Sequence, residues 1–278
     1  MNRREFLFGA LAAGAVLPVM STKGVEKSAA RKLRIAHMTD PQFGFGPGKG
    51  VDAKYAADLK RFERALEMVN DLKPDLALIT GDMTNRPQDV ARDWPRLLGL
   101  FKVPVLVAPG NHDLGMPVLK ANRDRYLSVF GYDYKSIDIA GWRVIAGNTQ
   151  FWRKTDLVDE QAKYEAWLKD ELNRAKAEMN GRVIVAGHIP PFVGLHNEKD
   201  SYENCPKVSR HDRMRAYRHS GVRFFLAGHT HRMAMRGFKE LTILNAETTG
   251  NNFDQRPQGF RMFEVNNESD YSYNFVKV

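Results

Sequence analysis

The chain has 278 residues, of which 43% are hydrophobic and 27% charged, so it holds enough apolar material for one sizeable core or two small ones. This composition excludes a disordered tail, a collagen-like fibre and a small disulfide scaffold. A single cysteine, Cys205, excludes an intrachain disulfide and a Cys-rich zinc or iron–sulfur site, and the formal charge of +9 suits an anionic substrate or partner.

The first thirty residues have the pattern of an export signal. Arg3 and Arg4 stand directly before an apolar, uncharged run from Leu7 to Met20. The arginine pair resembles a twin-arginine signal, which predicts export to a bacterial periplasm with the twin-arginine translocation machinery as a partner. The alternative is an N-terminal helix that stays on the chain. No run of about 18 apolar residues occurs, so no ordinary membrane span is expected, although an uncleaved signal would tether the protein to the membrane.

After residues 1–30, the chain alternates short aliphatic runs with helical patterns, and nothing resembles a domain linker. The sequence therefore predicts one α/β domain over residues 31–278. Strands are predicted over Leu33–Met38, Leu76–Thr80, Val105–Ala108, Tyr134–Ile139, Trp142–Ala146, Arg182–Ala186, Val222–Ala227, Met233–Phe238, Leu241–Leu244, Phe260–Val265 and Tyr271–Val278. Helices are predicted over Tyr55–Leu72, Asp89–Leu100, Val118–Phe130, Asp159–Met179 (with Asp159 as N-cap) and Arg210–Ser220.

Polar side chains follow five of the predicted strands, at the point where each strand ends. Sites in α/β sheets form at the carboxyl ends of the strands. Packed together, the aspartates would raise one another's pKa unless a cation neutralised them. Mixed Asp, Asn and His ligands suit Mn, Fe or Zn better than Ca. The five motifs are Asp40, Gly81-Asp82, Gly110-Asn111-His112-Asp113, Gly187-His188 and Gly228-His229-Thr230-His231.

These five motifs, in this order, resemble those of the calcineurin-like metallophosphoesterases. Asp40-Pro41-Gln42-Phe43-Gly44 and residues 204–210 are similar to a subgroup of calcineurin-like phosphoesterase domain proteins of the protein-phosphatase type. The resemblance implies an α/β fold in which two β-sheets form a sandwich flanked by helices. It also implies a centre of two divalent metal ions that lowers the pKa of water and neutralises charge on the phosphoryl group.

The resemblance implies a role for each motif residue. One metal ion would be held by Asp40, Gln42, Asp82 and His231. The other would be held by Asp82, Asn111, His188 and His229, with Asp82 bridging. His112 would lie beside the phosphoryl group as proton donor or charge stabiliser, and Asp113 would orient it.

Gln42 stands where the superfamily usually has a histidine. An amide oxygen is a weaker ligand than imidazole, so we expect weaker binding of the first metal ion and a bias toward a harder ion such as Mn or Mg. The alternative is that Gln42 lies outside the ligand shell and hydrogen-bonds a bound water.

Residues outside the motifs point less strongly to function. His37 is expected to be a core histidine, and Cys205 a thiol without a catalytic task. Tyr202 and Asn204 lie in a long polar segment and are candidates for substrate contact, although a merely solvated loop is an equal alternative. Arg256 is a further candidate for phosphate contact.

The leading functional interpretation is a metal-dependent phosphomonoesterase acting on phosphorylated protein side chains or small phosphomonoesters. A phosphodiesterase acting on nucleotides or phospholipid headgroups is the alternative, because it uses the same motifs. A non-catalytic metal-binding protein is disfavoured because both His112 and Asp82 are present. No nucleic-acid partner is expected, because the basic stretch from Arg210 to Arg218 lacks interleaved aromatic residues.

Overall fold

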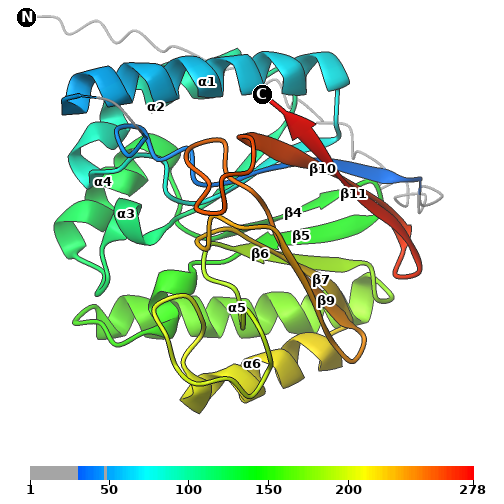
Figure 1. Ribbon diagram of the computed structural model, residues 1–278. Coiled ribbons are helices and arrows are strands. Elements are labelled where there is room, and N and C mark those ends of the chain that lie inside the picture. Colours follow the sequence, from blue (N-terminus) through cyan, green and yellow to red (C-terminus); the bar gives the residue numbers. More distant parts are fainter. Residues whose placement is uncertain (1–30, 47–48) are drawn as a thin grey trace, which may run out of the picture.

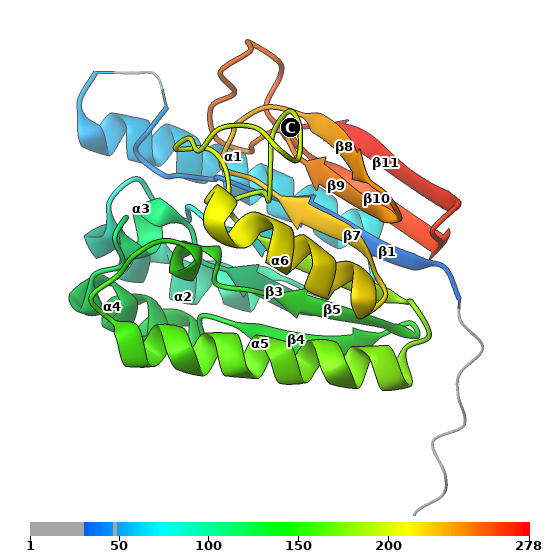
Figure 2. The same ribbon diagram turned by 90° about the horizontal axis from the view of Figure 1, so that it is seen from below.

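The computed structural model describes residues 31–46 and 49–278, so the predicted export signal over residues 1–30 lies outside the described residues. Two β-sheets form the centre of the molecule, and helices cover both outer faces (Figure 1). Helices α1 (Val51–Leu72) and α2 (Val90–Leu100) lie over one sheet, and α5 (Val158–Glu178) and α6 (Lys207–His219) lie side by side over the other (Figure 2). This arrangement confirms the predicted sandwich of two sheets flanked by helices.

Both sheets are mixed. Antiparallel strands form both edges of the second sheet and one edge of the first, whose other edge is the parallel strand β3. The first sheet has the order β11-β10-β1-β2-β3, and the second β4-β5-β6-β7-β9-β8. The strands of the first sheet are β1 (Leu33–Met38), β2 (Leu76–Thr80), β3 (Val105–Ala108), β10 (Gly259–Asn267) and β11 (Asp270–Lys277). Those of the second are β4 (Lys135–Ile139), β5 (Trp142–Ala146), β6 (Val183–Gly187), β7 (Val222–Ala227), β8 (Ala234–Phe238) and β9 (Leu241–Asn245).

The central strands are largely apolar because both of their faces are buried. In β1, Leu33 and Ile35 point between the two sheets, whereas Ala36 and Met38 pack beneath the helices. Side chains of the second sheet such as Val144 pack into this inner layer from the other side. Along the central strands of the second sheet, side chains also point alternately toward the inner layer and toward the helices. The sequence patterns therefore matched the observed strands closely.

The main differences from the predicted elements are at element ends and in the short helix over Asn111–Leu114, which was not predicted. Helix α1 begins at Val51 rather than Tyr55, and α6 begins at Lys207 rather than Arg210. The prediction of Asp159 as N-cap is wrong, because Leu157 takes that position. Asp159 instead lies in the first turn, where its negative charge interacts favourably with the positive end of the helix dipole. None of the helices in the described part of the chain combines the length and apolar character needed to cross a membrane.

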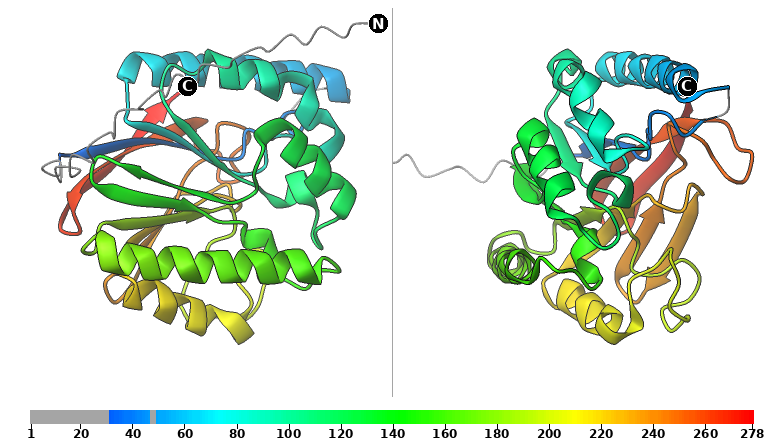
Figure 3. Two further views of the ribbon diagram at one scale, coloured as in Figure 1. Left: turned by 180° about the vertical axis from the view of Figure 1, so that it is seen from behind. Right: turned by 90° about the vertical axis from the view of Figure 1, so that its left-hand side faces the viewer.

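The carboxyl ends of the parallel strands meet at one end of the sandwich. Strands β1, β2 and β3 run parallel in one sheet, and β5, β6, β7 and β9 do so in the other. Helices α3 (Asn111–Leu114) and α4 (Lys120–Phe130) lie at this end, on the left of Figure 1 and toward the viewer in the right panel of Figure 3. The loops that carry the five polar motifs therefore converge there.

His37 lies in the core, as expected. Its side chain is fully buried between the sheets, with Nδ1 2.7 Å from the hydroxyl of Tyr273 and Nε2 2.9 Å from Oγ1 of Thr80. Burial lowers the pKa of His37 to about 3. The folded protein therefore keeps this ring neutral at pH values where the unfolded chain, with an ordinary pKa of about 6.5, binds a proton.

We expect His37 to make the fold sensitive to acid. Its contribution to stability is complete above about pH 6.5 and is lost as the pH falls toward 3, by about 1.4 kcal/mol per pH unit. Chemical denaturation at pH 7 and pH 5 should show the free energy of unfolding falling about 2 kcal/mol further in the wild type than in His37→Gln. Equal falls in the two proteins would contradict this assignment.

Candidate metal centre

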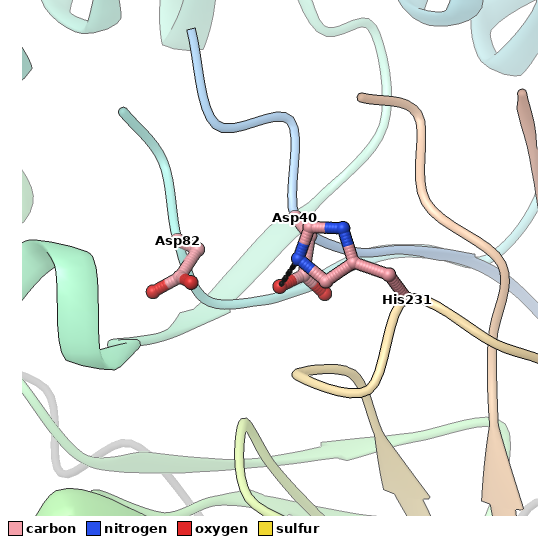
Figure 4. Close-up of side chains that lie close together, drawn as sticks. All are labelled: Asp40, Asp82 and His231. Atoms are coloured by element: carbon pink, nitrogen blue, oxygen red, sulfur yellow. Dashed lines mark ion pairs between the residues drawn. The ribbon is translucent and has the colours of Figure 1, made fainter. Parts of the chain in front are cut away.

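Two carboxylates and an imidazole from three different strand ends form the first half of the site. Asp40 follows β1, Asp82 follows β2 and His231 follows β7. All three side chains are buried, and one ligand atom from each lies within 4.8 Å of the others. Nε2 of His231 is 3.3 Å from Oδ1 of Asp40, with the Asp82 carboxylate facing the same space (Figure 4).

The second half of the site lies beside Asp82. Nε2 of His188, which follows β6, is 3.3 Å from Oδ2 of Asp82 and 3.0 Å from Oδ1 of Asn111. Nδ1 of His229 is 3.1 Å from the same His188 nitrogen. Asp82 therefore lies between the two sets of predicted ligands, where a bridging carboxylate would have to be.

The three histidines are oriented by the main chain. A carbonyl oxygen only accepts hydrogen bonds, so the ring nitrogen against it carries the proton and the other ring nitrogen can bind a cation. In all three rings that other nitrogen faces the carboxylates or their neighbours. The orienting contacts are His188 Nδ1 to Thr80 O at 2.8 Å, His229 Nε2 to Tyr202 O at 3.0 Å, and His231 Nδ1 to Asn251 O at 2.6 Å.

The electrostatics of the site favour positive charge. Burial opposes a charge on His188, but the carboxylates of Asp82 and Asp40 outweigh it and raise the pKa of His188 to about 9. Burial likewise opposes ionisation of Asp40, yet His231 and His188 hold the pKa of Asp40 below its ordinary value. Closely packed carboxylates of this kind are stabilised by cations.

Two buried oxygens lack a partner among the described residues. Oδ1 of Asp40 and Oε1 of Gln42 make no hydrogen bond, although Oδ1 faces His231. A buried polar atom without a partner costs free energy, and such atoms call for an explanation. A cation would satisfy both oxygens, so the carboxylate, amide and imidazole groups here fit a metal centre.

The backbone is shaped to bring these side chains together. Non-glycine residues adopt a positive φ only rarely, and strain of this kind gathers at functional sites. Glycines help at the same turns: a Cβ on Gly228 would collide with the hydroxyl of Thr39 and the carboxylate of Asp40. The predicted ligands with positive φ are Asp40 at 47°, Gln42 at 41°, Asp82 at 54°, His229 at 69° and His231 at 51°.

We expect Gln42→His to tighten binding of the first metal ion by about tenfold, because imidazole is a stronger ligand than an amide oxygen. Calorimetric titration of metal-free protein with Mn²⁺ measures this. Gln88→His adds an imidazole to an exposed position outside the site and serves as the control. An unchanged dissociation constant in Gln42→His would remove Gln42 from the ligand set.

His112 lies beside the carboxylates, and only one of its two ring nitrogens makes a hydrogen bond among the described residues. Its backbone N–H donates to Oδ1 of Asp82 at 2.8 Å, which fixes its position against the predicted bridging residue. Its Nδ1 donates to the carbonyl oxygen of Asn85 at 2.9 Å. Among the described residues, its Nε2 atom makes no hydrogen bond.

Asp113 does not orient His112 as expected. Both oxygens of its carboxylate accept backbone N–H groups, from Gly110 at 2.7 Å, Met83 at 2.8 Å and Asp82 at 2.9 Å. The Asp113 carboxylate therefore joins the loop after β2 to the loop after β3. The carbonyl oxygen of Asn85, and not Asp113, orients the His112 ring. A contact through a backbone carbonyl does not depend on residue type, so the sequence does not reveal that Asn85 orients the His112 ring.

The three candidate substrate residues have different surroundings. Tyr202 reaches the site: its hydroxyl accepts from Nδ2 of Asn111 at 2.8 Å, and its ring centroid is 4.8 Å from that of His229. Arg256 is half-exposed and paired with Asp254 at 3.0 Å.

Asn204 is buried, and its side chain is used within its own loop. Its Nδ2 donates to Glu198 at 2.6 Å and to the Lys199 carbonyl at 2.9 Å, and its Oδ1 accepts from Ser201 N at 3.0 Å. Asn204 therefore shapes the loop and has no atom left for a substrate, contrary to expectation.

Together, the sandwich fold and the convergent carboxylates, amides and imidazoles define a metal-dependent hydrolase of phosphate esters. The chain belongs to the calcineurin-like phosphoesterase family, whose family model matches residues 33–233. Among curated proteins, it is 27% identical over 247 residues to serine/threonine-protein phosphatase CPPED1 of Rattus norvegicus, covering 82% of this chain and 79% of the relative. The human protein of that name is 26% identical over 248 residues, with the same coverage.

A solved structure has the same fold. A dimetal phosphatase from Danio rerio superposes with a TM-score of 0.62 at 14% identity, covering 88% of this chain and 97% of that one. The fold and the family thus agree with the metallophosphoesterase predicted from the five motifs.

Proposed function

We propose that this protein is a phosphomonoesterase that uses two divalent metal ions. The observation that carries the proposal is the position of Asp82, between His188 on one side and Asp40 with His231 on the other. The first metal ion would be held by Asp40, Gln42, Asp82 and His231. The second would be held by Asp82, Asn111, His188 and His229.

The bound ions would supply positive charge for the phosphoryl oxygens and lower the pKa of water so that hydroxide is present at neutral pH. The protein's own contribution is to hold the ligands rigidly, through strained strand ends and carbonyl-oriented rings. His112, fixed through Asp82 and Asn85, directs Nε2 at the leaving group. It donates a proton to the departing oxygen or stabilises its charge.

The test combines elemental analysis of the purified protein with a panel of phosphate esters. We expect two metal ions per chain and faster hydrolysis of an aryl phosphomonoester than of the matching diester in Mn²⁺. Strong preference for the diester would favour the alternative, a phosphodiesterase acting on nucleotides or phospholipid headgroups. Mn or Mg is favoured over Zn and Fe because Gln42 contributes a hard oxygen ligand.

Phosphorylated protein side chains are one proposed substrate class. The relatives named serine/threonine-protein phosphatase CPPED1 support it, since their coverage includes most of both chains. Small phosphomonoesters remain the second class, and comparing phosphopeptides with sugar phosphates would separate the two.

Export by the twin-arginine route is the proposed localisation, supported by Arg3, Arg4 and the apolar run after them. In a bacterial host, Arg3→Lys with Arg4→Lys should move the protein from the periplasmic to the cytoplasmic fraction, while Arg31→Lys should not. An unchanged distribution would contradict the signal.

A further inference from the structure

Two neighbouring phenylalanine rings border the candidate metal centre, one beside the predicted proton donor His112 and the other beside His231. The ring centroid of Phe45 is 6.4 Å from that of His112 and 5.7 Å from that of His231. Phe253 stacks on His231, with a centroid distance of 4.3 Å and an interplanar angle of 6°, and meets Phe45 edge to face at 6.1 Å. These rings come from the loop after β1 and from the loop between β9 and β10, so only the fold makes them neighbours.

The exposure of these side chains is unusual. Phe253 is 47% exposed, although its ring could be buried in the core like most aromatic rings of the chain. Tyr202, on the other side of the site beside His229, is 57% exposed. Within residues 31–46 and 49–278, Tyr202 and Phe253 are the two most exposed of the phenylalanine, tyrosine and tryptophan side chains, and both border the candidate metal centre.

The loop that carries Tyr202 is held in place rather than loose. The Nη2 atom of Arg153 donates to the carbonyl oxygens of Ser201 at 2.7 Å, Tyr202 at 2.9 Å and Asn204 at 2.9 Å. The fully buried Arg210 holds the same loop from beneath, through the carbonyl of Cys205 at 2.8 Å. The exposure of Tyr202 is therefore built into the fold.

The positions of Phe45 and Phe253 indicate which part of a substrate they would contact, namely the leaving group. If His112 acts on the leaving oxygen, the leaving group would lie near the His112 ring, whose centroid is 6.4 Å from that of Phe45, with Phe253 next to Phe45. Aromatic rings attract one another edge to face or offset-stacked, in addition to the gain from burying their area. A flat aromatic leaving group would gain this contact, whereas a short alkyl group would not.

We propose that Phe45 and Phe253 form a subsite for an aromatic leaving group, so that phosphomonoesters of phenols, including phosphotyrosine side chains, are preferred to those of alkyl alcohols. This inference rests on the proposed phosphomonoesterase function. It concerns the alcohol half of the substrate, which the metal ligands and His112 do not select.

Phe253→Ala tests the subsite. We compare variant with wild type separately on phenyl phosphate and on phosphoserine, so that the different reactivities of the two leaving groups cancel. The kcat/KM for phenyl phosphate should fall about tenfold and that for phosphoserine less than about twofold. Phe253→Tyr should restore the wild-type ratio, and Leu119→Ala, an exposed apolar residue outside the site, should leave both values unchanged.

Two further measurements separate the possible failures. Equal losses on both substrates, together with a lower metal content, would mean that Phe253 only supports His231, and this result would overturn the subsite. No loss on either substrate would also overturn it. Calorimetry on metal-loaded protein should show phenylphosphonate binding at least about fivefold more tightly than methylphosphonate, with the difference lost in Phe253→Ala. A wild type that hydrolyses no phosphate ester would overturn the proposed function, whereas the phosphonate comparison would still decide the subsite.

Discussion

Replacing Asp82 with asparagine should lower kcat/KM for an aryl phosphomonoester by about a thousandfold or more. The residue faces both predicted ion positions, and its Oδ1 also accepts the backbone N–H of His112 at 2.8 Å. An amide keeps the shape but loses the charge. It also leaves only one acceptor oxygen, so one contact, to His188 or to the His112 N–H, would face an NH₂ group. The variant should therefore lose metal ions as well as turnover.

The measurement is steady-state kinetics in Mn²⁺ alongside elemental analysis of the same preparation. The metal content should fall from two ions per chain to one or none, while circular dichroism reports an unchanged fold. Asp124→Asn, an exposed carboxylate paired with Lys120, is the matched control. Full activity and full metal content in Asp82→Asn would remove the dinuclear centre from consideration.

Replacing His112 with asparagine should lower kcat by about a hundredfold to ten-thousandfold, the usual range for a lost general acid. The ring touches the Asn85 carbonyl and no predicted metal ligand through its side-chain nitrogens, so the metal content should stay at the wild-type value. Loss of turnover without loss of metal is thus the distinguishing result.

The role of His112 as proton donor has a further signature. The loss should be smaller for 4-nitrophenyl phosphate than for phenyl phosphate, because nitrophenolate leaves without protonation more readily. An equal loss on both esters would assign His112 to charge stabilisation and contradict proton donation. His211→Asn, an exposed histidine on α6, should leave both rates unchanged.

The candidate metal ligands could be found from the sequence because the motifs that carry them follow buried strands and resemble those of a known family. Asp40 and Asp82 each follow a short, largely apolar run by one or two residues, and such runs are typical of buried strands. Parallel strands place their carboxyl ends at one edge, so residues such as Asp40 and His231, nearly two hundred positions apart, could be expected to meet.

The contacts that these residues make with their neighbours could not be predicted from the sequence in the same way. The partner of the His112 ring is a backbone carbonyl, and main-chain oxygens carry no residue identity. Asp113 has the type expected of an orienting carboxylate, yet three backbone N–H groups occupy it. Phe253 lies in an irregular loop with no periodic pattern, so its stacking on His231 could not be anticipated.

The positions of the strands along the chain and the chemical character of the site therefore follow from local pattern, because apolar runs and residue types can be identified in the sequence. The order of the strands within the two sheets depends on contacts between distant segments. The orientation of each imidazole, the use of Asn204 and Asp113 as loop supports, and the aromatic border of the site depend on contacts between distant segments. Such contacts form only after the two sheets pack, and side-chain direction is then set by whichever main-chain groups come within hydrogen-bond reach.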